Sequence, residues 1–430
     1  MKRLAVAAVV IWSGVCAGEL RAQKPPLLAE KDLAALANEL SGETAKRNLE
    51  GIARFHRQRG SRGFHEAAEL VAERLRAYGL SDVAILQFPA DGKIFYGAQR
   101  SRPAWDAEVG ELWEMKAKPV QYKSPVTGGA EFRLDFTDEK IANYAAEPVV
   151  LAEDSASANV AAELVDVGEG TKERDYAGKD VKGKIVLASA QPGAVQDLAV
   201  GKFGAVGIVS YAQNQKTAWW GEDENLIRWG HLETFSPNET FAFMVSLKTA
   251  RGFRERLTKG EKITLHAAVK ATRLPGYYEV VTATIPGRDP KLKDEEIAFS
   301  CHLDHQRPGA NDNASGCVTI LEVARTIQKL IDTKQLARPA RTLRFIFPPE
   351  IEGTLAFLNG TGLIENEEPD LAQRAPVPPM TQRPMQSFES KALASKIKAV
   401  VHLDMVGGRA GDESGVPRDT RADELAEFCA

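Results

Sequence analysis

Apolar positions recur at helical spacing through the first part of the chain. From Pro26 to about Leu80 the pattern is helical, and it is strongest from His65 to Tyr78. Within that segment Ala68, Leu70, Val71, Leu75 and Tyr78 recur mostly three or four residues apart, which predicts one buried helix face. Gly79 is a natural stop for this helix, and the short apolar run Val83 to Phe88 predicts the strand that follows it.

The pattern changes between about Val149 and Lys270. Short β-like runs, namely Val149–Leu151, Glu163–Val167 and Lys184–Leu187, are separated by turns rich in Gly, Asp and Lys. A helical stretch with Ala194, Leu198 and Ala199 leads from the centre of this region to the apolar run Gly204–Val209. The region therefore reads as an inserted, mostly β module.

From Tyr277 onward, strand and helix patterns alternate. The predicted strands are Glu279–Ile285, Glu296–Cys301, Thr342–Phe347 and Ile397–Leu403, and the intervening helix has one apolar face made of Cys317, Ile320, Leu321, Ala324, Ile327 and Ile331. This alternation predicts an α/β fold with a mixed, largely parallel sheet sandwiched by helices. The Pro- and Gln-rich segment 368–387 predicts a long surface loop.

Composition and charge narrow the class of protein. The chain has 430 residues, 43% of them hydrophobic, which is enough for two or three domains that each bury a core. Its formal net charge is −4, and basic and acidic residues are interspersed. Without a basic stripe there is no feature that favours a nucleic-acid partner.

The N-terminus is typical of an exported protein. Met1-Lys2-Arg3 precedes an apolar run and small residues, so residues 1–22 are predicted to be a signal peptide cleaved after Ala22, and the protein secreted or periplasmic. The alternative is an N-terminal membrane anchor, although the run is shorter than the ~20 residues a span needs. No later segment is predicted to span a membrane.

The cysteine count argues against a disulfide framework. Removal of the signal takes Cys16 with it and leaves an odd number, namely Cys301, Cys317 and Cys429. Cys301 and Cys317 are therefore predicted to be small buried hydrophobes.

Candidate chemistry falls at three predicted strand ends. These are Cys301-His302-Leu303-Asp304 with the following Gly309–Gly316, Pro349-Glu350, and Val401-His402-Leu403-Asp404. A parallel sheet places its site beyond the carboxyl ends of its strands, and imidazole and carboxylates are ligands that zinc accepts. His302, Asp312 and Asp404 are therefore candidate ligands of one ion, and Asp304 is a candidate to orient the His302 imidazole.

Each of these features also has a purely structural interpretation. The Asn311–Ser315 stretch could be a turn and helix N-cap, Asp404 could close a turn, and Glu350 could open a helix. His302 could be an ordinary strand-end histidine. What favours a metal site is the joint placement of all three segments on strand ends.

The motifs His302-x-Asp304, Gly309-Ala310-Asn311-Asp312-x-Ala314-Ser315-Gly316 and Leu403–Gly407 resemble those of the di-zinc aminopeptidase metallopeptidases, a family that includes secreted bacterial aminopeptidases and glutamate carboxypeptidases. The match is most specific over 279–407. The resemblance implies that His302 and Asp404 hold one of two zinc ions, that Asp312 bridges, and that Glu350 stands beside the metals as base or ligand. The inserted module likewise resembles a protease-associated domain, through Gly183–Val186 and Gly204–Gly207.

The sequence departs from the family pattern in two places. Glu350 lies between Pro349 and Ile351 where the family has adjacent glutamates, with Glu352 two residues on, and no histidine follows His402. We therefore expect either a C-terminally incomplete peptidase domain or an incomplete second zinc site, with His305 a less favoured substitute ligand.

The expected organisation is a signal peptide (1–22), the N-terminal part of the peptidase domain (23–148), a protease-associated-like insert (149–272) and the metallopeptidase domain (273–430). The expected function is hydrolysis of terminal residues of peptide or protein substrates. Two alternatives stay open: a non-catalytic binding relative on the same fold, and a glutaminyl-cyclase-like enzyme.

The insert contains an aromatic cluster made of Trp219, Trp220 and Trp229. This cluster is either local core or a contact surface. The oligomeric state is not predicted.

Overall fold

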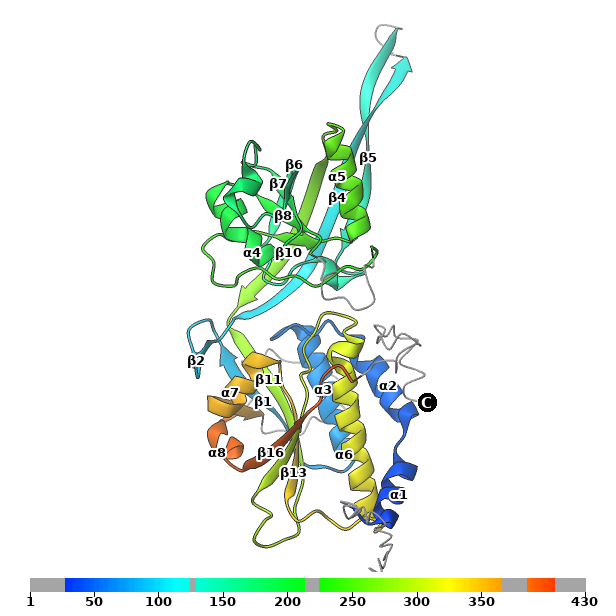
Figure 1. The fold of residues 1–430 in the computed structure, drawn as a ribbon, viewed down its shortest axis with the longest axis vertical. Coiled ribbons are helices and arrows are strands. Elements are labelled where there is room, and N and C mark those ends of the chain that lie inside the picture. Colours follow the sequence, from blue (N-terminus) through cyan, green and yellow to red (C-terminus); the bar gives the residue numbers. More distant parts are fainter. Residues whose placement is uncertain (1–27, 124–128, 213–223, 366–384, 407–430) are drawn as a thin grey trace, which may run out of the picture.

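The computed structural model describes residues 28–123, 129–212, 224–365 and 385–406. Two parts lie one above the other along the long axis of the molecule (Figure 1), each built around its own seven-stranded sheet. We call the lower part the α/β domain and the upper part the β module. The predicted signal peptide, Cys16, Cys429, Trp219 and Trp220 lie outside the described residues.

The sheet of the α/β domain is mixed, as predicted, but most of its strand pairs are antiparallel, whereas the sequence predicted a largely parallel sheet. Its strand order is β15-β14-β1-β11-β13-β12-β16. The bounds are β1 (Ser81–Ala90), β11 (Gly276–Ile285), β12 (Glu296–Ser300), β13 (Thr342–Phe347), β14 (Thr361–Glu365), β15 (Met385–Glu389) and β16 (Ile397–His402). Strands β13, β12 and β16 pair parallel, whereas β15, β14, β1, β11 and β13 pair antiparallel. Parallel pairing is thus confined to the three strands that carry the candidate chemistry.

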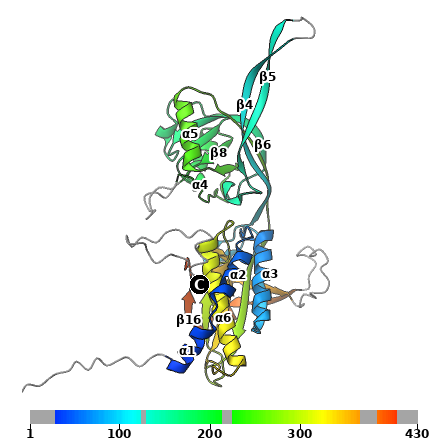
Figure 2. The same ribbon diagram turned by 90° about the vertical axis from the view of Figure 1, so that its right-hand side faces the viewer.

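Helices cover both faces of this sheet (Figures 1 and 2). One face carries α1 (Glu30–Glu39), α2 (Gly42–Ile52), α3 (Arg62–Ala77) and α6 (Gly316–Asp332), and the other carries α7 (Ile351–Asn359) and α8 (Ser390–Ala394). Alternate residues of β11 divide between the two cores, because side chains alternate across a strand: Val281 packs with α3 and α6, and Val280 with α7. The result is a three-layer α/β architecture.

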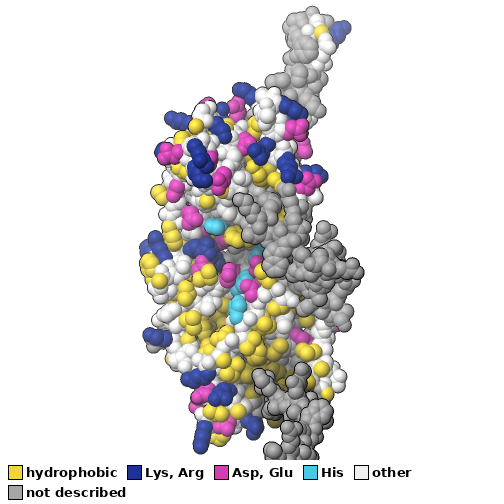
Figure 3. Space-filling model, in the orientation of Figure 1, with side chains coloured by type: hydrophobic (Ala, Val, Ile, Leu, Met, Phe, Trp, Pro, Cys, Tyr) yellow, Lys and Arg dark blue, Asp and Glu magenta, His cyan; other side chains and the backbone are white. Residues whose placement is uncertain are grey.

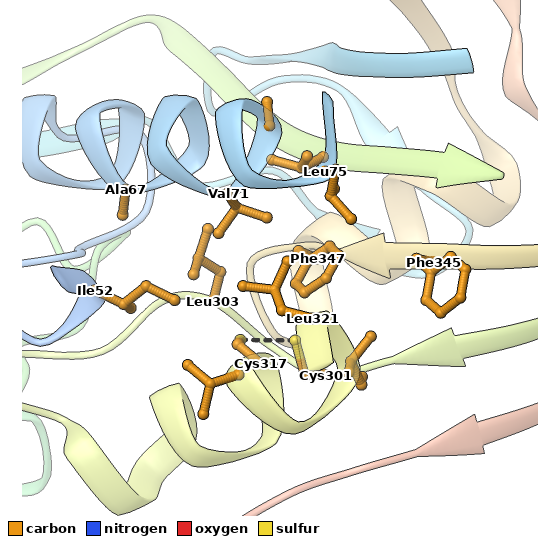
Figure 4. Packing of buried hydrophobic residues seen from close by; sticks show 14 of the residues in the cluster. Ile52, Ala67, Val71, Leu75, Cys301, Leu303, Cys317, Leu321, Phe345 and Phe347 are labelled. Carbon is orange, nitrogen blue, oxygen red and sulfur yellow. Dashed lines mark hydrogen bonds between the residues drawn. The ribbon is translucent and has the colours of Figure 1, made fainter. Parts of the chain in front are cut away.

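Helix α3 confirms the helix predicted over His65–Tyr78, beginning three residues earlier and ending at Ala77. The Ser61 hydroxyl caps it by accepting a hydrogen bond from the Phe64 N–H at 3.1 Å. Phe64, Ala68, Val71 and Leu75 are buried along one face, and Gly79 follows with φ +83°. Helix α6 buries Cys317, Ile320, Leu321 and Ala324 in the same core (Figure 4).

The β module is a second mixed sheet in the order β5-β4-β10-β6-β7-β8-β9. Its elements are β4 (Ala104–Lys123), β5 (Ala130–Asn143), β6 (Ala158–Gly168), β7 (Ile185–Ala188), β8 (Gly207–Ser210), β9 (Ala242–Met244), β10 (Thr264–Leu274), α4 (Pro192–Gln196) and α5 (Leu247–Thr258), with the shorter turns η1 (Pro148–Val150), η2 (Glu173–Tyr176) and η3 (Asp197–Lys202). The sheet extends further toward the N-terminus than the predicted range 149–272, because β4 pairs with β10 along its length.

One predicted β run of the module is wrong. Residues 148–150 form the 3-10 turn η1, and Leu151 makes only an isolated bridge to Phe243. Pro148 at the start of the turn fixes φ and removes a backbone donor, which favours a turn over a strand.

Buried ion pairs join the two parts. The Arg59 guanidinium, in the segment before α3, pairs with Asp154 at 2.9 Å and with Glu153, and both acids belong to the module. Thr234 donates its hydroxyl to Asp154 at 2.6 Å, and Arg273 of β10 donates to the Asp154 carbonyl at 2.9 Å. Because removing one partner of such a network leaves a buried charge uncompensated, these contacts fix the module against the α/β domain.

The remaining short elements are the hairpin β2 (Phe95–Tyr96) and β3 (Gln99–Arg100), and the π-helical turn η4 (Ala310–Ser315) before α6. None of the helices in the described ranges combines the length with the apolar character that crossing a bilayer requires.

Candidate metal centre

Three strand ends converge at one edge of the α/β sheet. Strands β12, β13 and β16 are parallel neighbours, so their carboxyl ends lie side by side. His302 follows β12, Glu350 follows β13 and Asp404 follows β16. The fourth contributor, Asp312, lies in η4, which leads back from β12 to α6.

His302, Asp312 and Asp404 form a compact cluster, hereafter the ligand cluster. The Nε2 atom of His302 lies 3.1 Å from Asp312 Oδ1 and 3.5 Å from Asp404 Oδ1. One ligand atom from each residue lies within 4.8 Å of the others. One imidazole and two carboxylates are a donor set that suits zinc, so the residues present fit the ion that the sequence predicts.

Asp304 lies beside the His302 ring, where the sequence predicted an orienting group. The Nδ1 atom of His302 is 3.0 Å from the Asp304 carbonyl oxygen and 3.3 Å from its Oδ1. An Nδ1–H donated to these oxygens leaves Nε2 facing the two other carboxylates, which is the usual way in which a second group orients a metal-binding imidazole. Asp304 Oδ1 also accepts a hydrogen bond from the Glu350 N–H at 2.7 Å, so it connects two strand ends.

The electrostatics of the cluster favour a cation. Burial alone would lower the pKa of His302, but hydrogen bonds with Asp304 and Asp312 outweigh it and raise this pKa to about 11. Burial likewise opposes ionisation of Asp312, and hydrogen bonds from His302 and His305 outweigh it and hold its pKa well below the ordinary value. A positive charge between the His302 ring and the Asp312 carboxylate is therefore strongly favoured.

His305 contacts the other oxygen of the Asp312 carboxylate. Its Nε2 lies 3.4 Å from Asp312 Oδ2, and its Nδ1 lies 2.9 Å from the Gln306 carbonyl oxygen. Both imidazoles thus have Nδ1 at a main-chain carbonyl and Nε2 at Asp312, one on each carboxylate oxygen. This is the arrangement in which a carboxylate can bridge two ions.

A buried guanidinium holds the segment that carries these residues, residues 301–316, hereafter the ligand loop. The Arg57 side chain is fully buried and donates to the carbonyl oxygens of Leu303 at 2.7 Å and Gly309 at 3.0 Å. It also donates to the carbonyls of Pro308, Ile52 and Phe55. Burial lowers the pKa of Arg57 to about 10, which still leaves it charged. The loop is therefore fixed through its main chain.

Two glycines of the loop stand where a side chain would collide. Gly309 has φ +49°, and a Cβ there would lie 2.7 Å from the His305 ring and 2.8 Å from Arg57 Nη2. A Cβ at Gly316 would lie 2.4 Å from the Leu403 carbonyl oxygen. These close approaches explain the glycines at both ends of the Asp312 motif.

Asn313 connects the ligand loop to the third ligand. It is fully buried, its Nδ2 donates to the Leu403 carbonyl at 2.9 Å, and its Oδ1 accepts from the Met405 N–H at 3.1 Å. The two bonds bracket Asp404 in the chain. The position of Asp404 relative to Asp312 therefore depends on one amide side chain.

Glu350 occupies the N-cap position of α7, without a capping hydrogen bond from its side chain, and lies at the edge of the cluster rather than within it. Burial raises its pKa above the ordinary carboxyl value, although the nearby His302 acts in the opposite direction. Glu352, a possible second carboxylate, forms a buried ion pair with Arg102 instead. Ile351 between them is largely exposed.

The cluster lies in a pocket of about 320 Å³ between the two parts. Figure 3 shows histidines and acidic side chains gathered at this level of the molecule. The α/β domain supplies the ligand cluster, Asp304, His305, Glu350 and Arg102, and the β module supplies Glu153, Trp229 and His231. The Trp229 and His231 rings are stacked, with centroids 5.6 Å apart. Sequence reasoning named Trp229 but missed Arg57, Arg102 and His231, because nothing near them in the chain marks a site. It also gave no role to Asn313, which lies beside Asp312 but contacts the chain around Asp404 only in the fold.

Fold and site together define a three-layer α/β protein with a histidine–aspartate cluster at the ends of parallel strands, an arrangement similar to the fold of the zinc exopeptidases. Residues 280–352 match the family model described as Peptidase family M28, and this segment contains His302, Asp304, Asp312 and Glu350. The resemblance inferred from the motifs is thereby confirmed over this segment of the chain.

Three known proteins are similar to parts of this chain. Leucine aminopeptidase 1 of Pyrenophora tritici-repentis (strain Pt-1C-BFP) is 28% identical over 184 residues, which is 40% of this chain and 44% of that protein. A zinc aminopeptidase from Bacillus subtilis is structurally similar, with a TM-score of 0.51 and 16% identity over 86% of this chain and 70% of its own. An aminopeptidase from Aneurinibacillus sp. strain AM-1 gives 24% identity and a TM-score of 0.42, over 76% and 66% of the two chains. This chain thus spans less than half of the curated relative, and the Bacillus structure supports the fold.

Proposed function

We propose that this protein is a secreted, zinc-dependent exopeptidase of the aminopeptidase type. The observation that carries the proposal is the ligand cluster, with His302 Nε2 at 3.1 Å from Asp312 and 3.5 Å from Asp404, inside a pocket of a chain that carries an M28 segment. That cluster consists of the three residues predicted to be ligands of one ion, His302, Asp312 and Asp404.

In this proposal His302, Asp312 and Asp404 hold zinc, and Asp304 keeps the His302 ring in position. Bound there, zinc would supply Lewis-acid activation of a peptide carbonyl and of water. Glu350 would accept a proton from the attacking water on its carboxylate and return it to the leaving amine. Its raised pKa suits that exchange, since a general base works best with a pKa nearer to neutrality than that of an ordinary carboxyl.

The number of ions is a separate part of the proposal. Family resemblance leads us to expect two, and Glu352 is engaged by Arg102 and so is withheld from a second ion. The second oxygen of Asp312, together with His305 Nε2 at 3.4 Å, is the place where a second ion would bind. We expect this half of the centre to bind more weakly, because the described residues offer it only one imidazole and a shared carboxylate.

The charges of the pocket favour an amino terminus as the bound end of the substrate. Asp304 and Glu350 contribute acidic groups beside the ligand cluster, whereas the pocket's Arg102 is paired with Glu352. A positively charged terminal amine is attracted to such a cleft and a terminal carboxylate is repelled. Trp229 and His231 of the module would contact the terminal side chain.

Export and the nature of the module complete the proposal. The sequence pattern of residues 1–22 supports a cleaved signal and a secreted or periplasmic location. The β module, inserted between β1 and β11 of the α/β sheet, is proposed to be protease-associated-like. N-terminal sequencing of the exported protein should begin at Gln23.

A second candidate is a non-catalytic binding protein on the same fold. It is favoured by the environment of Glu350, whose neighbours provide no second free carboxylate: Ile351 is apolar and Glu352 is paired. Such a protein would bind peptide ends in the same pocket without turnover.

The decisive test combines metal content with turnover. We expect elemental analysis to find at least one zinc per chain, and chelation to abolish hydrolysis of aminoacyl-nitroanilides, with recovery on adding zinc. The control is Glu350→Gln, which should keep its zinc and lose most of its turnover. Zinc-loaded protein that binds peptides but never hydrolyses any of them would favour the binding protein, and protein without zinc affinity would reject the peptidase proposal.

A further inference from the structure

Two cysteines lie in contact beneath the ligand loop. Cys301 directly follows β12, Cys317 belongs to the first turn of α6, and their Sγ atoms are 2.7 Å apart (Figure 4). Their residues are 1% and 0% exposed. From the sequence, the odd number of cysteines in the mature chain predicted separate buried hydrophobes, but the fold turns the two side chains toward each other.

The surroundings leave the sulfur atoms no better partner. The pair is embedded among apolar side chains of the core that include Leu321, Phe345 and Phe347. The other contact of Cys317 Sγ is the His302 carbonyl oxygen at 3.2 Å. Carbon atoms in non-bonded contact lie about 3.5–4.0 Å apart, and sulfur is larger, so two independent thiols would pack further apart than these do.

We propose that Cys301 and Cys317 form an intrachain disulfide. The bond closes a ring around the whole ligand loop, which contains His302, Asp304, His305 and Asp312. In forming it, each thiol loses one proton and one electron, and the electron pair reduces a small-molecule or protein disulfide to two thiols. An oxidising compartment supplies such disulfides, which agrees with the export proposed above, although the geometry stands without it.

Burial determines when the bond forms and how it resists reduction. Because Cys301 and Cys317 are 1% and 0% exposed, the folded protein shields both sulfur atoms from reductants and from other thiols. The bond therefore forms while the chain folds, before α6 packs on the sheet, and it is protected from reductants afterwards. Cys429, outside the described residues, is the competing thiol of the mature chain.

Peptide mapping tests the proposal directly. The full chain is folded with reduced and oxidised glutathione, unfolded in the presence of an alkylating reagent without reductant, and digested with trypsin. Because Pro308 follows Arg307, residues 294–325 stay in one peptide that contains both cysteines. We expect this peptide to be unalkylated and two hydrogens lighter than the dithiol form, and to take up two alkyl groups only after reduction.

A second digestion separates the two cysteines. Cleavage on the amino side of Asp304 and Asp312 places Cys301 and Cys317 in different peptides, which should remain joined until reductant is added. The matched control is Cys429→Ser, which should leave the map of the 294–325 peptide unchanged, whereas Cys317→Ser should expose Cys301 to alkylation. Alkylation of both cysteines in unreduced wild-type protein would overturn the proposal, as would a link from either one to Cys429. Neither result depends on zinc binding or turnover.

Discussion

The two sides of the ligand cluster are built in different ways. His302 and Asp312 belong to the ligand loop, which is buried over the core and bound to Arg57 through its carbonyl oxygens. Asp404 follows β16, an edge strand whose Val400 and Val401 are 57% and 42% exposed. Two ligands thus lie on a buried support, whereas the third follows a strand that is largely exposed among the described residues.

The difference shows that a ligand need not be fixed by its own element. Asp404 is held by the Asn313 side chain of the ligand loop, which donates to the Leu403 carbonyl before it and accepts from the Met405 N–H after it. The loop therefore positions all three ligands, two by covalent connection and one through an amide. Damage to the loop should affect the whole centre, and damage to β16 should affect only one ligand.

The largest effect is expected from Arg57→Met. It would leave the carbonyl oxygens of Leu303, Pro308 and Gly309 buried without this donor, and each such group costs about 1–3 kcal/mol. We expect the free energy of unfolding to fall by about 4 kcal/mol and zinc binding to be lost. Chemical denaturation and elemental analysis measure these, with Arg54→Met, at an exposed position of the same segment, as the control. A stable Arg57→Met protein with normal zinc content would show that the loop does not need this support.

Removing single ligands compares the two sides directly. His302→Ala and Asp404→Ala should each weaken zinc binding by more than about 100-fold, since outer partners of a ligand alone contribute about 10–100-fold. In the metal-free protein only His302→Ala should lower the melting temperature appreciably, because His302 is buried and Asp404 is exposed. Calorimetry with and without chelator separates the effects, and Lys398→Ala on β16 is the control. An equal loss of metal-free stability in both variants would break the comparison.

Asn313→Ala should act on the third ligand from the loop side. We expect zinc affinity to fall by about 10–100-fold, as for other groups that orient ligands, while His302 and Asp312 stay in place. Zinc titration in a competing chelator measures the change. Asn311→Ala is the matched control, because the buried Asn311 Oδ1 has no hydrogen-bond partner among the described residues. A similar loss of affinity in both variants would show that Asn313 has no special part in placing Asp404.

The smallest effect is expected in the module. Trp229→Ala should raise the KM for aminoacyl substrates by a few-fold and leave zinc content unchanged, because Trp229 lines the pocket without contacting the ligand cluster. Trp113→Ala, on β4 away from the pocket, should change neither quantity. If Trp229→Ala lowered zinc content, the module would have to be counted as part of the metal centre.

The local parts of this molecule could be predicted from its sequence. Helix α3, helix α6 and strands β11, β12, β13 and β16 follow from periodicity, and the strand ends identified His302, Asp312 and Asp404 as candidates before their distances were known. Strands β14 and β15 were missed because a long polar segment separates them in the chain, and η1 was read as a strand because three apolar residues carry no periodicity.

What the sequence left open is contact between distant segments. Arg57 lies about 250 positions from the loop that it supports, and Asn313 about 90 from Asp404. Neither contact has a spacing rule, so neither could be inferred without the fold. The part of the pocket that the β module supplies could not be inferred either. The same is true of the contact between Cys301 and Cys317, because the odd number of cysteines argued against pairing.

The contacts of Arg57 also bear on how this protein can change over evolution. Its guanidinium binds carbonyl oxygens, which every amino acid possesses, so it imposes a shape on the ligand loop without prescribing the side chains at Leu303, Pro308 or their neighbours. Descendants that keep this arginine are free to vary the residues that line the entrance to the pocket. Substrate preference can therefore diverge among them by point substitution while the positions of His302 and Asp312 are inherited intact.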